Sequence, residues 1–196
     1  MRMLELFSGS GNMAKAFKKE GYTTLTVDLS CEADLNIDIR ELTPEMVIKA
    51  LGGYPDVIWA SPPCTEFSVA SIGKHWKSGK PPAEGTELLM HALRLITQLA
   101  PKYWFIENPR GMMRTLPIMQ ALPRRTLTFC QYGEKRMKPT DVWTNHKLWY
   151  PNCCKNGATC HDAAPRGSKT GTQGVKGAYD RGVLPPKLCK EIASIC

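Results

Sequence analysis

The sequence predicts an α/β fold in which a mostly parallel sheet is covered by helices on both faces. Two observations support this. Apolar runs typical of strands occur at residues 1–7, 22–29, 55–60, 102–109 and 124–133. Helical patterns lie between most of them, at residues 13–21, 43–52 and 84–101, and another closes the chain at 184–195. Strands that alternate with helices are typical of a parallel sheet, because each crossover packs a helix back onto the sheet.

Each element also carries its own boundary signals. The glycine-rich loop "SGSGN" separates the first strand from the first helix. Thr43 is a good N-cap, Pro44 suits the first helical position, and Gly52 stops that helix. The apolar run "DVIWA" reads as a buried strand that ends at "SPPC", and Pro101 closes the longest amphipathic helix. We expect residues 150–182 to be irregular, since they are rich in Cys, Gly, Lys and Thr and show little periodicity.

The size and charge of the chain narrow the function classes. With 196 residues and 42% hydrophobic residues, the chain is long enough for one well-filled core. The start "MRMLELF" lacks the features of a signal peptide, and no apolar run is long enough to span a bilayer, so we expect a cytoplasmic protein of a bacterium or a phage-infected host. The net charge of +8 and the pI of about 9.1 favour a nucleic-acid partner, although an unspecialised basic surface is the alternative.

Polar features follow three of the predicted strands directly. These are the loop from Gly9 to Gly11, Cys64 and Glu107. Because ligands bind at the carboxyl edge of open α/β sheets, we expect these groups to share one site. Cys64, held by two prolines, is a candidate nucleophile, against the alternative of a structural thiol. Glu107 is a candidate acid whose pKa an apolar strand would raise, against the alternative of a residue that caps a turn.

The first two strand ends also suggest a cofactor. Gly9 and Gly11 let the backbone approach a ligand closely, and Asp28 is well placed to accept hydrogen bonds from ribose hydroxyls. The loop lacks the lysine of a phosphate-binding loop. The pattern therefore favours a nucleoside-containing cofactor, with a tight turn and a surface aspartate as the alternative.

The motifs "LELFSGSGN", "VDLS", "SPPCTEFS" and "FIENP" together resemble those of the DNA cytosine-5 methyltransferases, from residue 3 to about 145. "GVLPPKLCKEI" is similar to the last motif of that family. The resemblance implies a Rossmann-like fold, S-adenosylmethionine as methyl donor, and a cytosine flipped out of double-stranded DNA as substrate. By the same resemblance Cys64 is the nucleophile that attacks C6, and Glu107 protonates N3.

The resemblance also assigns the cofactor pocket and shows some departures. Phe7, Gly9 and Gly11 would line the methionine side, Asp28 would bind the ribose, Asp38 the adenine amine, and Pro62 would pack near the reactive centre. Where the family has Gln-x-Arg-x-Arg, this chain has "EKRMK", so Arg136 or Lys138 would contact the cytosine carbonyl. The last motif opens with Arg181-Gly182 in place of Gly-Asn. Residues 69–86 resemble the mobile loop that closes over the flipped base.

The segment "CCKNGATCH" has the chemistry of a metal site. Cys154, Cys160 and His161 are candidate zinc ligands, and Cys130 or Cys153 could complete a tetrahedral set. The alternative is a group of reduced surface thiols. Beyond it, Arg166, Lys169 and Lys176 suit contacts with the DNA backbone, against the alternative of a solvated linker.

The chain therefore divides into three parts. Residues 1–149 form the predicted catalytic core, 150–182 a short insert for target recognition, and 183–196 a helix that returns to the core. The insert is shorter than the usual recognition domain, as in phage-encoded solitary enzymes. No membrane contact and no obligate protein partner are expected. An enzyme acting on RNA or another cytosine-containing substrate, and a non-catalytic DNA-binding relic, are the alternatives.

Overall fold

The structure is a computed structural model, and it describes residues 1–69, 72–76, 79–162 and 177–196. The elements are β1 (Arg2–Leu6), α1 (Asn12–Lys19), β2 (Thr23–Val27), α2 (Pro44–Leu51), β3 (Val57–Ala60), α3 (Ile72–His75), α4 (Ala83–Leu99), β4 (Tyr103–Pro109), η2 (Met112–Thr115), α5 (Pro117–Gln120), β5 (Arg124–Thr128), η3 (Phe129–Tyr132), β6 (Pro139–Thr144), α6 (Ala178–Gly182) and α7 (Pro186–Ile195). Within the described residues, none of the helices combines the length and apolar character that a bilayer crossing requires.

The strands form one sheet in the order β2-β1-β3-β4-β6-β5. Strands β1 to β4 pair in parallel, whereas β6 runs antiparallel to both of its neighbours. The α/β fold with a mostly parallel sheet is thus confirmed. Because β1 to β4 are parallel, their carboxyl ends lie at one edge of the sheet; we call this the carboxyl edge.

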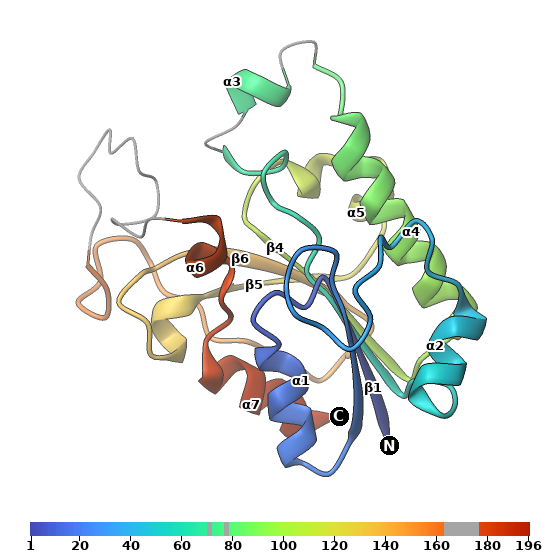
Figure 1. Ribbon diagram of the computed structural model, residues 1–196. Helices are drawn as coiled ribbons and strands as arrows, with labels where there is room; N and C mark the ends of the chain where they lie inside the picture. Colours follow the sequence, from blue (N-terminus) through green and yellow to red (C-terminus); the bar gives the residue numbers. More distant parts are fainter. Residues whose placement is uncertain (70–71, 77–78, 163–176) are drawn as a thin grey trace.

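Helices cover both faces of the sheet (Figure 1), and an apolar core lies on each face. One core packs α2 and α4 against the sheet, and the other packs α1 and α7 against it. Trp143 contributes to the first and Trp59 to the second, and both are fully buried. Helix α7, at the end of the chain, lies beside α1, at its beginning, so the last helix returns to the core.

The local signals set the boundaries of α2 as expected. The Thr43 hydroxyl accepts a hydrogen bond from the Met46 amide, and Pro44 occupies the first turn. Gly52 ends the helix with a φ of 73°, in the left-handed region where glycine is favoured. These contacts satisfy backbone groups that the helix itself leaves unpaired.

Some elements differ from the sequence prediction. The strand expected over 124–133 ends at Thr128, because the next residues turn into η3 and Gly133 closes that turn with a φ of 91°. Strand β6 was not predicted, because the buried Asp141 interrupts its apolar pattern. Within the insert, α6 adds a short helix to a segment that was expected to be irregular.

Candidate functional site

The carboxyl edge carries the ends of β1 to β4 and the side chains that follow them. The loop Phe7–Gly11 follows β1, Asp28 follows β2, and the segment Ser61–Cys64 follows β3, while Glu107 lies near the end of β4. The parallel pairing of these strands brings the four chain segments to the same place. The prediction of one shared edge is therefore confirmed.

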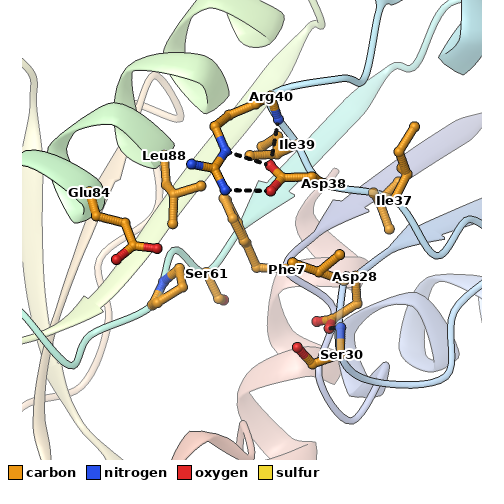
Figure 2. Close-up of a pocket in the computed structure, with 13 residues that line it drawn as sticks. Phe7, Asp28, Ser30, Ile37, Asp38, Ile39, Arg40, Ser61, Glu84 and Leu88 are labelled. Atoms are coloured by element: carbon orange, nitrogen blue, oxygen red, sulfur yellow. Dashed lines mark hydrogen bonds and ion pairs between the residues drawn. The ribbon is translucent and has the colours of Figure 1, made fainter.

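A cavity of about 330 Å³ opens at this edge (Figure 2). Its lining comes from the residue after β1, the segment from the end of β2 toward α2, the segment after β3, and α4. Apolar and acidic side chains predominate, together with two serines and one arginine: Phe7, Val27, Asp28, Leu29, Ser30, Ile37, Asp38, Ile39, Arg40, Ser61, Pro63, Glu84 and Leu88. Three of the residues predicted to hold a cofactor, Phe7, Asp28 and Asp38, thus lie in its wall. Apolar walls with a few acceptors are typical of a pocket for a nucleoside.

The other predicted cofactor residues lie outside this lining. Gly9 and Gly11 line a second pocket of about 580 Å³. Pro62 is buried, and its carbonyl accepts a hydrogen bond from the Asn108 side chain at 2.9 Å. Its neighbour Pro63 lines the cavity in its place.

Asp28 organises the loops at the mouth of the cavity. Its Oδ2 accepts a hydrogen bond from the Gly9 amide at 2.9 Å, and its Oδ1 accepts one each from the Ser30 and Cys31 amides at 2.8 Å. Phe7 has a φ of 56°, an unusual conformation for a residue with a side chain. Backbone strain of this kind costs about 1 kcal/mol or more and is common at ligand sites.

Asp38 is held by its neighbour Arg40. The guanidinium donates to both carboxylate oxygens, at 3.0 Å from Nε and 2.6 Å from Nη2 (Figure 2). These hydrogen bonds lower the pKa of Asp38 to about 2. An ionised Asp38 can accept a hydrogen bond from an amine, but its carboxylate oxygens would then be shared between that amine and Arg40.

Cys64 and Glu107 lie close enough for their charges to interact. Burial raises the pKa of the Cys64 thiol, and the charge of Glu107 raises it further, whereas Lys138 and Arg181 lower it. Burial also raises the pKa of Glu107, which is 5% exposed. A carboxyl group in this environment stays protonated at a higher pH than an exposed glutamate, as general acid catalysis requires.

Ser61, which the sequence analysis did not single out, supports Glu107. Trp59 Nε1 donates to Ser61 Oγ at 2.8 Å, which leaves the Ser61 hydroxyl to donate to Glu107. Within the described part of the chain, Glu107 Oε1 and Asn108 Oδ1 are buried without a hydrogen-bond partner. Buried polar atoms are rarely left in this state, so these two are available to a ligand.

Lys138 is a cation that lies close to both Cys64 and Glu107. Its pKa is lowered by burial, while the charges of Glu107 and Cys64 act in the opposite direction. Its Nζ donates to the Arg181 carbonyl at 2.7 Å and lies 4.2 Å from the centre of the Phe129 ring. The sequence left Lys138 and Arg136 as alternatives for contact with the cytosine carbonyl. The position of Lys138 near Cys64 and Glu107 favours Lys138.

Arg136 is engaged elsewhere. Its Nε and Nη2 contact Glu134 Oε2 at 2.6 and 2.5 Å. It is not among the groups that influence the pKa of Cys64 or Glu107 most strongly. The structure therefore does not bring Arg136 to the reactive pair in the way that it brings Lys138.

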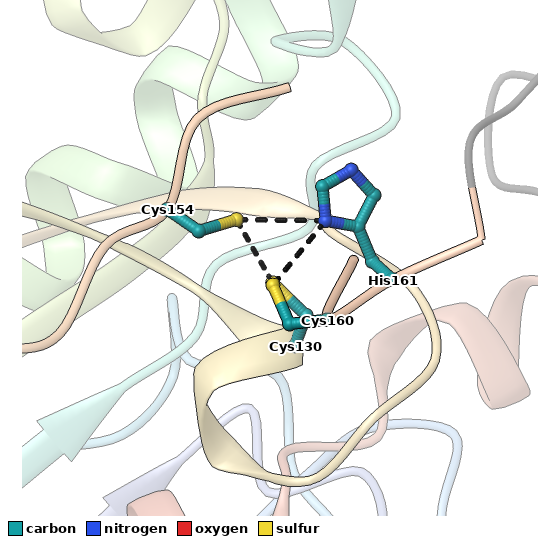
Figure 3. A group of neighbouring side chains, drawn as sticks. All are labelled: Cys130, Cys154, Cys160 and His161. Carbon is teal, nitrogen blue, oxygen red and sulfur yellow. Dashed lines mark hydrogen bonds between the residues drawn. The ribbon is translucent and has the colours of Figure 1, made fainter. Parts of the chain in front are cut away.

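The predicted metal ligands come together in a separate cluster. Cys130, Cys154, Cys160 and His161 offer ligand atoms that all lie within 4.8 Å of one another (Figure 3). Of the two cysteines that could complete the set, Cys130 does so and is buried, whereas Cys153 is exposed. The predicted DNA contacts Arg166, Lys169 and Lys176 lie outside the described residues.

Known proteins resemble this chain, one of them over its whole length. A family model described as C-5 cytosine-specific DNA methylase matches residues 1–116. A "probable DNA (cytosine-5)-methyltransferase" of Frog virus 3 (isolate Goorha) is 31% identical over 219 aligned residues, with all of both chains covered. The type II methyltransferase M.AquIA of Picosynechococcus is 30% identical over 57% of this chain, which spans half of that protein's length.

The fold has solved relatives as well. The crystal structure of the Dnmt2 methyltransferase of S. pombe superposes with a TM-score of 0.53 at 17% identity, over 77% of this chain and 52% of that one. An identity this low supports the Rossmann-like methyltransferase fold alone. The family model and the whole-length viral relative go further, and together they show that this chain belongs to the C-5 cytosine-specific DNA methylase family.

Proposed function

We propose that the chain transfers a methyl group from S-adenosylmethionine to C5 of cytosine in DNA, through a covalent bond between Cys64 and C6 of the base. The observation that carries the proposal is the position of Cys64 and Glu107 at the ends of neighbouring strands, beside a cavity with acidic and apolar walls. The hydrogen bond from Asn108 to the Pro62 carbonyl ties the two strand ends together. A fixed approach is what nucleophilic attack requires.

The cavity fits the proposed donor. Phe7, Ile37 and Leu88 provide apolar surface for a purine ring, and the Asp28 and Asp38 carboxylates provide acceptors for ribose hydroxyls and an amine. When bound, S-adenosylmethionine supplies a sulfonium methyl group. The residues of this chain would bind and orient it at the edge where Cys64 lies.

The remaining steps follow from the side chains. The Cys64 thiolate forms a bond to C6, and the electron pair of the C5=C6 bond moves to form a C4=C5 double bond. The electron pair of the N3=C4 bond moves to N3, which takes a proton from Glu107. C5 then takes the methyl group, and the sulfonium sulfur keeps the electron pair of the bond that breaks. A base removes the C5 proton, the C5=C6 double bond forms again as the Cys64–C6 bond breaks, and N3 returns its proton to Glu107. Lys138 would stabilise the thiolate and the negative charge that develops on the ring.

The base must leave the stack for these steps, at a cost of a few kcal/mol. Glu107 Oε1 and Asn108 Oδ1, buried and unpartnered among the described residues, are suited to donors and acceptors on the edge of a flipped base. A site that pairs with such an edge repays part of the unstacking cost.

Trapping of the covalent intermediate tests the proposal. DNA that contains 5-fluorocytosine should form a denaturation-stable complex with the protein, because fluorine at C5 cannot leave as a proton. Cys64→Ser should lose the complex, since a hydroxyl is a much weaker nucleophile near neutral pH. Glu107→Gln should still bind DNA, but form the complex about 10²-fold more slowly if general acid help is lost.

Two controls make the test specific. Cys153→Ser removes an exposed thiol outside the reactive pair and should form the complex as the wild type does. RNA with the same modified base separates the two substrate classes. Absence of any stable complex with DNA in the presence of S-adenosylmethionine would show that the assigned chemistry is wrong.

A further inference from the structure

Three thiols and one imidazole form a compact group away from Cys64 and Glu107 in the sequence, and we call this group the thiol–imidazole cluster. It consists of Cys130, Cys154, Cys160 and His161 (Figure 3). We infer that the cluster binds a structural zinc ion, and that this ion fixes the loop 134–138, which carries Lys138.

Three of the distances within the cluster match those of a tetrahedral site. Zn–S bonds of about 2.3 Å and Zn–N bonds of about 2.0–2.1 Å imply edges of about 3.8 Å between two sulfurs and about 3.6 Å between sulfur and nitrogen. Cys154 Sγ and Cys160 Sγ each lie 3.6 Å from His161 Nδ1, and Cys160 Sγ lies 3.7 Å from Cys130 Sγ. The Cys130–Cys154 sulfur distance of 3.1 Å is shorter, and a bound ion would separate this pair slightly.

The donor set selects the kind of ion. Thiolate sulfur and imidazole nitrogen are the ligands of structural zinc, whereas magnesium and calcium prefer oxygen. A set of four protein ligands leaves no open position, as in structural rather than catalytic sites. The Gln131 side-chain amide donates to Cys160 Sγ at 3.2 Å, which stabilises the negative charge of a thiolate.

Residues 150–162 bury few side chains, and this indicates that a bound ion would stabilise the segment. Among these residues, all of which the structure describes, His161 alone is buried, and helix and strand are absent. A segment that buries almost no apolar surface gains little from the hydrophobic effect. The cluster joins this segment to Cys130 in η3, and a metal ion would supply the binding energy that apolar packing does not.

The cluster is connected to the loop 134–138 on both sides. Next to Cys130, the Phe129 amide donates to the Met137 carbonyl at 2.8 Å. Next to His161, the Asp162 amide donates to the Lys135 carbonyl at 2.9 Å. An ion that holds both ligands thus holds both backbone contacts, and through them Lys138. The effect on Lys138 rests on the proposed function, whereas the metal site itself does not.

Metal content tests the site directly. Protein without an affinity tag, purified without added metal, should contain close to one zinc per chain by plasma mass spectrometry. After replacement of the ion by Co²⁺, the protein should show thiolate-to-cobalt charge transfer and the intense visible bands of a tetrahedral site. Cys154→Ser and Cys160→Ser should lose most of the zinc, and the matched variant Cys153→Ser should keep it.

Zinc in wild-type protein that persists in Cys160→Ser, or a wild type without zinc and without the tetrahedral cobalt spectrum, would overturn the inference. A disulfide between Cys130 and Cys154 is the competing outcome, and it would leave two fewer of the eight cysteines reactive toward a thiol reagent in unfolded, unreduced protein. The cobalt spectrum of the wild type needs no variant, so a variant that fails to fold does not decide the result. If zinc is present but its removal leaves methylation unchanged, the part of the inference that concerns Lys138 is wrong.

Discussion

Lys138 shows how a single residue can be assigned a role by its environment. It is half-buried, interacts electrostatically with Cys64 and Glu107, and donates a hydrogen bond to the Arg181 carbonyl. A cation beside a thiol favours the thiolate and stabilises negative charge that develops during reaction. The nearby Arg136 has the same formal charge but is paired with Glu134.

We therefore predict different effects for the two residues. Lys138→Met should lower kcat/KM for DNA methylation by ~10²-fold or more, as the loss of a transition-state donor does. Lys138→Arg, which keeps the charge, should retain more activity, and Arg136→Met should lose less than Lys138→Met. Steady-state kinetics and thermal melting of each variant are the measurements. An Arg136→Met variant more impaired than Lys138→Met, with equal stability, would reverse the assignment.

At the scale of elements, the start of α1 is held by a residue of another element. Its N-cap is Gly11, which has no side chain to cap the helix. Glu5 of β1 does this instead, because its Oε2 accepts a hydrogen bond from the Ala14 amide at 2.8 Å. Burial raises the pKa of Glu5 from 4.5 to about 7, although these backbone hydrogen bonds act in the opposite direction.

The raised pKa predicts a pH-dependent contribution to stability. The folded state binds the Glu5 proton more tightly than the unfolded state, so this contribution is complete below about pH 4.5 and is lost as the pH rises to about 7. A shift of this size corresponds to about 3 kcal/mol. Relative to the wild type, Glu5→Gln should therefore gain melting temperature between pH 5 and pH 8. A melting difference that does not change with pH would contradict the raised pKa.

The helices and strands differ in how well the sequence predicts them. Strands β1 to β4 and helices α1, α2, α4 and α7 were predicted, because their apolar patterns and capping residues are local. Strand β6 was not, because the buried Asp141 is compensated by Arg114, which is distant in sequence and donates to Asp141 Oδ2 at 2.8 Å from Nε. A charge that is paired across the fold looks like a surface residue in the sequence.

In the site, too, residues that depend on local sequence patterns could be predicted, and residues that depend on contacts formed by folding could not. Cys64 and Glu107 could be found because each directly follows or ends an apolar strand. The contribution of Ser61 could not, because it depends on the Trp59 hydrogen bond that orients its hydroxyl. The choice between Lys138 and Arg136 depended on folding too, since the sequence places both in one short run of charges.

For the whole molecule, the net charge of +8 favours binding to DNA, but it does not say which face binds. The proposed site lies at the carboxyl edge of the sheet. Lys19 and Lys49 lie in the last turns of α1 and α2, which run away from that edge. Positive charges at the two edges should therefore differ in their effect on DNA affinity.

The predicted backbone contacts Arg166 and Lys169 follow the thiol–imidazole cluster in sequence, and they lie outside the described residues. If each neutralises one phosphate, the double variant Arg166→Ser/Lys169→Ser should reduce the slope of log affinity against log salt by about 1.8. Affinity for different DNA sequences should weaken by a similar factor, because phosphate contacts carry no sequence information. Fluorescence anisotropy over a series of salt concentrations measures both quantities.

The double variant Lys19→Ser/Lys49→Ser is the matched control, since it removes the same charge from the opposite edge of the sheet. It should lower the affinity slightly through the overall field but leave the slope nearly unchanged. Equal slopes for the two double variants would show that Arg166 and Lys169 make no defined phosphate contact. The positive charge would then act on DNA as a general field, and contacts with phosphate would have to come from residues nearer the reactive pair.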